Sequence, residues 1–163
     1  MKPISKIISI VALGVILFSI AYYFEFSISN DEGDYIKLGG VLFHTSIDSG
    51  IKEAKNQSKP VFLYFRSETC YWCIVFEKEA LSDDRVIDLL NKEFVLISID
   101  TFKQKNTAQN LNVRTTPYMI FFDKDGKEIS RIPGYIPKEE FFVKLNELME
   151  QLRTKSAGVR NSS

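Results

Sequence analysis

The chain has 163 residues, of which 45% are hydrophobic and 13% aromatic, and this is enough for one domain with an apolar core and a short appendage. Its 21 lysines and arginines balance its 21 aspartates and glutamates, so it lacks the overall basic charge of a nucleic-acid-binding protein. Two cysteines and one histidine cannot supply the four Cys and His ligands of a structural zinc site. We expect no nucleic-acid partner, no metal and no organic cofactor.

An apolar run opens the chain. Residues 7–24 contain no charge, two lysines precede them and a glutamate follows. Eighteen uncharged residues reach the lower length of a membrane-spanning helix, and the lysines favour a cytoplasmic N-terminus. We therefore expect residues 1–26 to be a membrane anchor that leaves the rest of the chain outside the cytoplasm, in the periplasm or at the cell surface. The alternative is a signal peptide cleaved near Ser19-Ile20-Ala21, which would release a soluble exported protein.

The remaining sequence predicts one α/β domain between two polar segments. Residues 27–40 are polar and contain glycine, which is typical of a linker, and residues 153–163 form a polar tail. Between them, over residues 41–152, short apolar runs alternate with helical patterns. Strands are predicted at 41–43, 61–65, 94–99, 118–122 and 128–132, and helices at 48–57, after Cys70, from about 83, at 107–111 and at 137–152. This order favours a central mixed sheet flanked by helices.

The two cysteines form the motif Cys70-Tyr71-Trp72-Cys73, placed where the predicted strand 61–65 gives way to a helix. In the first turn of a helix, unpaired backbone N–H groups and the helix dipole both favour a thiolate. A cysteine three residues further on lies on the same helix face and can form a disulfide with the first. A disulfide across so short a loop adds little stability, so the motif predicts a redox-active dithiol rather than a structural bond.

Over about residues 41–152 the chain resembles the thioredoxin superfamily, and more narrowly its exported or membrane-anchored branch. The matching pieces are Lys59 to Phe65, the cysteine motif, Thr116-Pro117-Tyr118, the turn Asp123–Gly126, and Gly134. The resemblance implies a thioredoxin-like fold. It also implies that Thr116-Pro117 is the cis-proline loop, which faces the disulfide and pairs with the extended chain of a protein substrate.

The motif region departs from thioredoxin at two positions. Thr69 replaces the tryptophan before the first cysteine, and Tyr64 replaces the buried aspartate that helps to deprotonate the second. Glu68 is the nearest substitute for this proton relay, but exposed carboxylates are the common case, so a solvated loop charge is the favoured interpretation. Tyr71 and Trp72 form either an exposed patch that docks partners or a pair packed on the Pro117 loop, and the docking interpretation is favoured.

These features predict an extracytoplasmic thiol–disulfide oxidoreductase that reduces disulfides of partner proteins. Cys70 is expected to attack as the thiolate, and Cys73 to resolve the mixed disulfide. Thr116 and Pro117, with Tyr71 and Trp72, are expected to bind the partner. A membrane redox protein would exchange electrons with the domain, and the domain is expected to be a monomer. The alternatives are a disulfide-forming oxidase or isomerase on the same fold, or a non-enzymatic adaptor or chaperone.

Overall fold

The computed structural model describes residues 12–22 and 35–160, which belong to two compact units, Met1–Gly33 and Asp34–Ser163. In the first unit, residues 12–22 are helical. Within the described ranges, no helix has both the length and the apolar character needed to span a membrane. The rest of the apolar run expected to form an anchor or signal segment, residues 7–11 and 23–24, lies outside these ranges.

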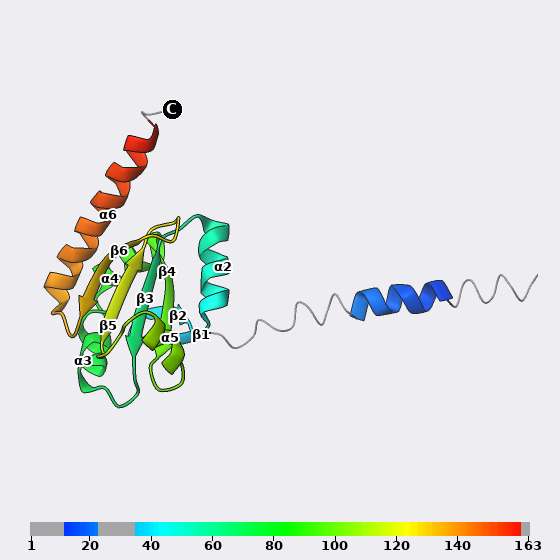
Figure 1. Cartoon of the computed structure of the whole chain (residues 1–163), viewed down its shortest axis with the longest axis horizontal. Helices are drawn as coiled ribbons and strands as arrows, with labels where there is room; N and C mark the ends of the chain where they lie inside the picture. The colour runs from blue at the N-terminus through cyan, green and yellow to red at the C-terminus, as the bar shows by residue number, and fades with distance from the viewer. Residues whose placement is uncertain (1–11, 23–34, 161–163) are drawn as a thin grey trace, which may run out of the picture. The chain divides into compact units, whose positions relative to one another are not determined.

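A six-stranded mixed sheet organises the second unit (Figure 1). Its strands follow the order β1-β2-β4-β3-β5-β6. β3 lies inside the sheet, parallel to β4 and antiparallel to β5. β1 and β6 form its edges, and each pairs antiparallel with its neighbour. The strands are β1 (Tyr35–Leu38), β2 (Val41–His44), β3 (Val61–Arg66), β4 (Val95–Asp100), β5 (Tyr118–Phe122) and β6 (Glu128–Pro133).

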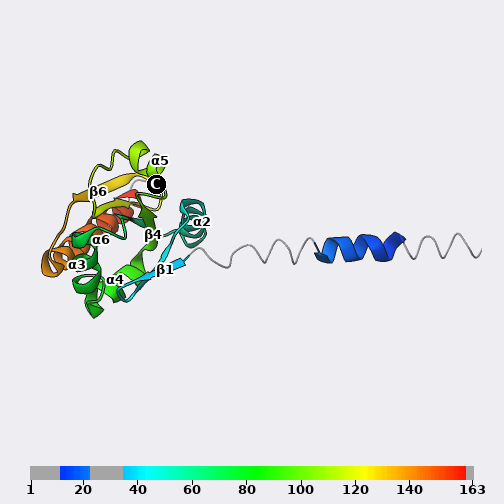
Figure 2. The same ribbon diagram turned by 90° about the horizontal axis from the view of Figure 1, so that it is seen from below.

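Helices cover both faces of this sheet, as the two views in Figures 1 and 2 show. On one face α3 (Tyr71–Glu79), α4 (Asp84–Glu93) and α6 (Lys138–Arg160) contribute buried side chains to one core cluster. On the other, α2 (Ile47–Gln57) and α5 (Lys105–Asn110) pack against a second cluster. The predicted α/β fold with a mixed sheet and flanking helices is therefore confirmed.

The buried strand β3 shows how the sequence fills both cores. Every residue from Val61 to Arg66 is buried, as expected for a strand covered by helices on both faces. Alternate side chains point to opposite faces of a strand. Phe62 and Tyr64 accordingly join the α3–α4–α6 core, whereas Leu63 and Phe65 join the α2–α5 core. Because these side chains are buried, they hold β3 in place, and the chain leads from its carboxyl end to the cysteine motif.

The domain extends beyond its predicted boundaries at both ends. β1 lies inside the segment 27–40 that was predicted to be a linker, so that prediction is wrong for Tyr35–Leu38. Ile36 and Leu38 pack on the core, and the left-handed Gly39 turns the chain into β2. Helix α6 continues to Arg160, past the predicted start of the tail at residue 153. Good helix formers such as Arg153 and Lys155 allow this extension, although few apolar residues are left to signal it.

Candidate active site

Cys70 caps the N-terminus of α3. The chain leaves β3 at Arg66, and a tight turn brings the Cys70 N–H to 3.2 Å from the Ser67 carbonyl oxygen. Cys70 itself is extended, and its Sγ accepts a hydrogen bond from the Cys73 backbone N–H at 3.1 Å. The sulfur therefore lies among the unpaired N–H groups of the first helical turn, where negative charge is stabilised.

Cys70 and Cys73 form a disulfide, with their Cα atoms 5.2 Å apart. The two residues differ in accessibility: Cys70 is half-buried, whereas Cys73 is completely buried on the inner face of α3. A partner can reach the Cys70 sulfur much more easily than the Cys73 sulfur.

The Thr116–Pro117 loop reaches the same end of the sheet. Tyr118 pairs with Phe65 in the β3–β5 register, so Pro117 lies beside the carboxyl end of β3, from which the chain leads to Cys70. The Thr116–Pro117 peptide bond is cis, as the sequence predicted. The Pro117 carbonyl accepts a hydrogen bond from Gly134 N–H at 2.9 Å, and this contact ties the loop to the end of β6. Thr116 is half-buried and Pro117 is buried.

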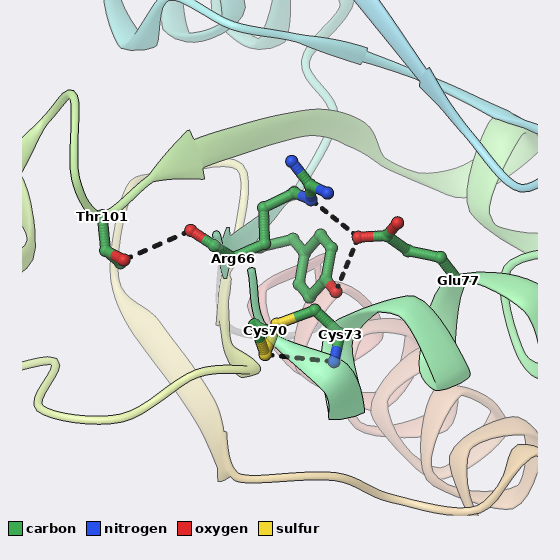
Figure 3. The surroundings of a disulfide bond; sticks show 6 residues. Arg66, Cys70, Cys73, Glu77 and Thr101 are labelled. Carbon is green, nitrogen blue, oxygen red and sulfur yellow. Dashed lines mark hydrogen bonds and ion pairs between the residues drawn. A yellow bond between two sulfur atoms is a disulfide. The ribbon is translucent and has the colours of Figure 1, made fainter. Parts of the chain in front are cut away.

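A buried polar network lies next to the disulfide. Glu77 is one turn beyond Cys73 on α3, and its Oε1 accepts hydrogen bonds from Arg66 Nε at 2.7 Å and from the Tyr64 hydroxyl at 3.2 Å. Figure 3 shows the Arg66–Glu77 pair beside Cys70 and Cys73. Tyr64 is fully buried, and burial, followed by the negative charge of Glu77, raises its pKa well above the usual range. The phenol therefore stays protonated and donates to Glu77.

Glu77 and Arg66 were not among the site residues predicted from the sequence. Tyr64 stands where thioredoxin has its buried aspartate, yet the carboxylate in this region comes from the helix opposite. A usable signal does exist in the spacing. Cys73 and Glu77 are four residues apart on a helix, and Tyr64 and Arg66 are two apart on a strand, so each pair shares a face.

Glu68, expected as a possible proton relay, lies in the turn between β3 and α3. Its side chain is 69% exposed and forms an ion pair with Lys103 Nζ at 3.0 Å. The hydrogen bond that Lys103 donates to Glu68 raises the pKa of Lys103. The structure therefore places Glu68 on the surface, with its carboxylate held by a lysine.

The aromatic pair between the cysteines is exposed at the surface. Tyr71 is 68% exposed and Trp72 52% exposed, and their rings meet edge to face with centroids 5.3 Å apart. The indole of Trp72 also packs on Tyr135, at 4.9 Å between centroids. The Tyr135 hydroxyl donates a hydrogen bond to Glu79 Oε2, at 2.6 Å. Trp72 is thus held by the segment after β6, while much of its surface stays open to solvent.

The fold and the Cys70–Cys73 disulfide define a thiol–disulfide oxidoreductase. The chain belongs to the thioredoxin-like domain family, whose model matches residues 47–148. It is 34% identical over 103 residues to the thiol:disulfide interchange protein DsbD of Photorhabdus laumondii, a match that covers 60% of this chain and 17% of that protein. The chain therefore spans only about a sixth of the length of such relatives.

Solved structures show the same fold. A thioredoxin from Thermus thermophilus aligns with a TM-score of 0.61 and 27% identity, covering 66% of this chain and 87% of that protein. The oxidised C-terminal domain of DsbD from Neisseria meningitidis aligns with a TM-score of 0.53 and 19% identity, covering 64% of this chain and 90% of that domain.

Proposed function

We propose that the domain reduces disulfides in partner proteins. The Cys70 thiolate attacks one sulfur of the partner disulfide and forms a mixed disulfide, and the other partner sulfur leaves as a thiolate. Cys73 then attacks the Cys70 sulfur, which releases the second partner thiolate and leaves Cys70–Cys73 oxidised. Two electrons and two protons pass from the domain to the partner.

The different burial of the two cysteines is the observation that carries these roles. Cys70 is partly exposed at the N-terminus of α3, whereas Cys73 is fully buried behind it. An attacking sulfur must be reached by a partner protein, and a resolving sulfur needs to reach only its neighbour. The Thr116–Pro117 loop lies at the same end of the sheet, where the backbone of Thr116 can hold an extended partner segment as an added strand.

Glu77 is our candidate for the proton acceptor of Cys73. It lies one turn away on the same face of α3, in a buried network with Tyr64 and Arg66. A carboxylate in that position can take the Cys73 proton as the mixed disulfide is resolved. Glu68 remains the alternative, but its exposed ion pair with Lys103 supports the role less well.

The charges near the disulfide support the reductive direction. Arg66 is paired with Glu77, and the intervening residues Tyr71 and Trp72 carry no charge. The helix N-terminus is then the main group that stabilises a Cys70 thiolate. Strong oxidants of this fold depend on a strongly stabilised reduced form, so moderate stabilisation favours a reducing dithiol.

We place the domain outside the cytoplasm, tethered by the N-terminal apolar run. The support is in the sequence, where two lysines precede the uncharged residues 7–24. Tethering would raise the effective concentration of a membrane redox protein that returns electrons to Cys70–Cys73. A reporter enzyme that is active only outside the cytoplasm, fused after residue 163, should be active. A fusion active only in the cytoplasm would contradict this placement.

The reductase proposal is tested by the reduction potential of the whole chain, equilibrated in dithiothreitol or glutathione buffers. A value near about −270 mV is expected, and a value near about −120 mV would mean that the domain donates disulfides instead. Cys70→Ser and Cys73→Ser variants test the roles. Cys70→Ser should lose all turnover, whereas Cys73→Ser should accumulate a mixed disulfide with the partner. Accumulation on Cys73 in the Cys70→Ser variant would reverse the assignment.

A further inference from the structure

A cavity of about 250 Å³ opens beside the segment that leads into Pro117. Thr116 forms part of its wall, and Thr101, after the end of β4, forms another part. Ala108 and Val113, both buried, contribute apolar surface to it. Neither the cysteine motif nor the Glu77 network uses this cavity.

The cavity adjoins the path expected for a partner segment. The Thr101 N–H and hydroxyl both donate hydrogen bonds to the Arg66 carbonyl, at 2.9 and 3.3 Å. Arg66 ends β3, four residues before Cys70, and Figure 3 shows Thr101 in the same region as the disulfide. A segment that pairs with the backbone of Thr116 would therefore pass the mouth of the cavity close to its own cysteine.

The two charged residues that line this cavity are both positive. Lys105 and Arg114 line it, both are exposed, and no carboxylate lies among its lining residues. Within the part of the chain that the structure describes, neither cation forms an ion pair. Neighbouring cations differ in this respect, because Arg131 is paired with Glu128 and Lys103 with Glu68.

We propose that this cavity is a subsite for an acidic side chain, aspartate or glutamate, close to the disulfide of the partner protein. The proposal rests on the proposed function and adds a substrate preference to it. The apolar surface would contact the methylene groups of the acidic side chain, and the two cations, with the Thr116 hydroxyl, would face its carboxylate. Partners with lysine at that position would meet like charges and be disfavoured.

The test uses the whole chain in its reduced form and fluorogenic peptides that hold one intrapeptide disulfide. Each peptide differs at one of the positions that lie within two residues of the attacked cysteine. That position carries glutamate, glutamine or lysine. At one of these positions the second-order rate constant should be about fivefold higher for glutamate than for glutamine, and lower again for lysine. The preference should shrink at about 1 M salt, because salt screens exposed charges.

A double variant, Lys105→Gln with Arg114→Gln, should abolish the preference for glutamate and leave the reduction of the glutamine peptide unchanged. The matched control, Lys52→Gln with Lys144→Gln, removes the same charge from α2 and α6 and should keep the preference. Equal rates for all peptides, or a preference that survives the Lys105/Arg114 substitutions, would overturn the subsite. If no peptide is reduced at all, the proposed function fails instead, so the two failures are distinguishable.

Discussion

Two carboxylates flank the cysteine motif, and they lie in opposite environments. Glu68, two residues before Cys70, is 69% exposed and pairs with a lysine that is 73% exposed. The side chain of Glu77, four residues after Cys73, is 13% exposed and pairs with Arg66, which is 10% exposed. Although both form ion pairs, only Glu77 is joined by a buried hydroxyl, that of Tyr64.

The difference shows that a position beside the motif does not tell which carboxylate can act on the buried Cys73 sulfur, because Glu68 and Glu77 are five and four residues from Cys73. Glu68 lies in a turn, where its side chain extends into water. Glu77 lies on the helix face that packs against β3, on the same side of α3 as the buried Cys73. A charge in water is screened, whereas a charge removed from water interacts strongly with its neighbours.

The largest effect predicted by this comparison concerns stability. Replacing Glu77 by alanine would leave the Arg66 guanidinium buried without its carboxylate partner. The free energy of unfolding should fall by roughly 3–5 kcal/mol, as when one partner of a buried ion pair is removed. Urea unfolding of the oxidised chain measures it. The double variant Arg66→Met with Glu77→Leu should recover most of the loss, because it leaves no buried charge unpaired. A Glu77→Ala variant as stable as the parent would show that water reaches the pair.

A buried carboxylate far from the cysteines in the fold should give a smaller effect that depends on pH. Asp123 accepts hydrogen bonds from the Asp125 and Lys127 N–H groups, at 3.0 and 2.9 Å, and from Lys155 Nζ. Burial raises its pKa, but these three bonds outweigh burial and lower the pKa overall. Because the folded-state pKa is below the unfolded one, the stabilisation is complete above about pH 4 and is lost as the pH falls through the folded-state value.

Unfolding midpoints measured from neutral to acidic pH test this prediction. The parent chain should lose stability below about pH 4 more steeply than Asp123→Asn, which lacks the titrating carboxylate. The loss of unfolding free energy caused by Asp123→Asn should be smaller than that caused by Glu77→Ala, because Lys155, the partner of Asp123, is half exposed. The control Asp125→Asn removes a more exposed carboxylate from the same turn and should keep the parent's slope. Parallel curves for the parent and Asp123→Asn would contradict the prediction.

Glu77 should also affect the rate of the step in which Cys73 resolves the mixed disulfide. Glu77→Gln keeps an oxygen that can accept bonds from Arg66 and Tyr64 but has less affinity for a proton. Release of a model peptide from its mixed disulfide with Cys70 should slow by at least about tenfold, whereas formation of the mixed disulfide should change little. Quenched-flow measurement of how the mixed disulfide rises and then decays gives the rates of both steps. An unchanged release rate would remove Glu77 from the proton-transfer step.

Patterns local in sequence predicted most of this structure. The apolar run of β3, the helical pattern of α2 and the turn at Asp123 each depend on neighbours within a few residues. β1 was missed because its short run contains Lys37 and is flanked by polar and glycine residues. Its strand character becomes evident only through its pairing with β2 and through the packing of Ile36 on the core.

The Cys70–Cys73 disulfide and the cis-proline bond were also predictable, because each follows from a short sequence motif. The Glu77 network was not, because it joins residues 11 and 13 positions apart on two elements whose relative rotation is set by packing. The spacing places Glu77 on the face of Cys73 and Arg66 on the face of Tyr64, but it does not show that these two faces meet. The cavity with Lys105 and Arg114 is non-local for the same reason, because β4, α5 and the loop before β5 meet there only in the fold.

The smallest expected effect is at Glu68. Glu68→Gln removes the exposed pair with Lys103, so both steps of peptide reduction should change by less than about twofold, and the unfolding midpoint should not shift measurably. Measured beside Glu77→Gln with the same peptide, this variant separates a buried proton acceptor from a surface charge. If resolution slows in Glu68→Gln but not in Glu77→Gln, the turn must rearrange in the mixed disulfide and bring Glu68 to Cys73. The proton-accepting role would then pass to Glu68.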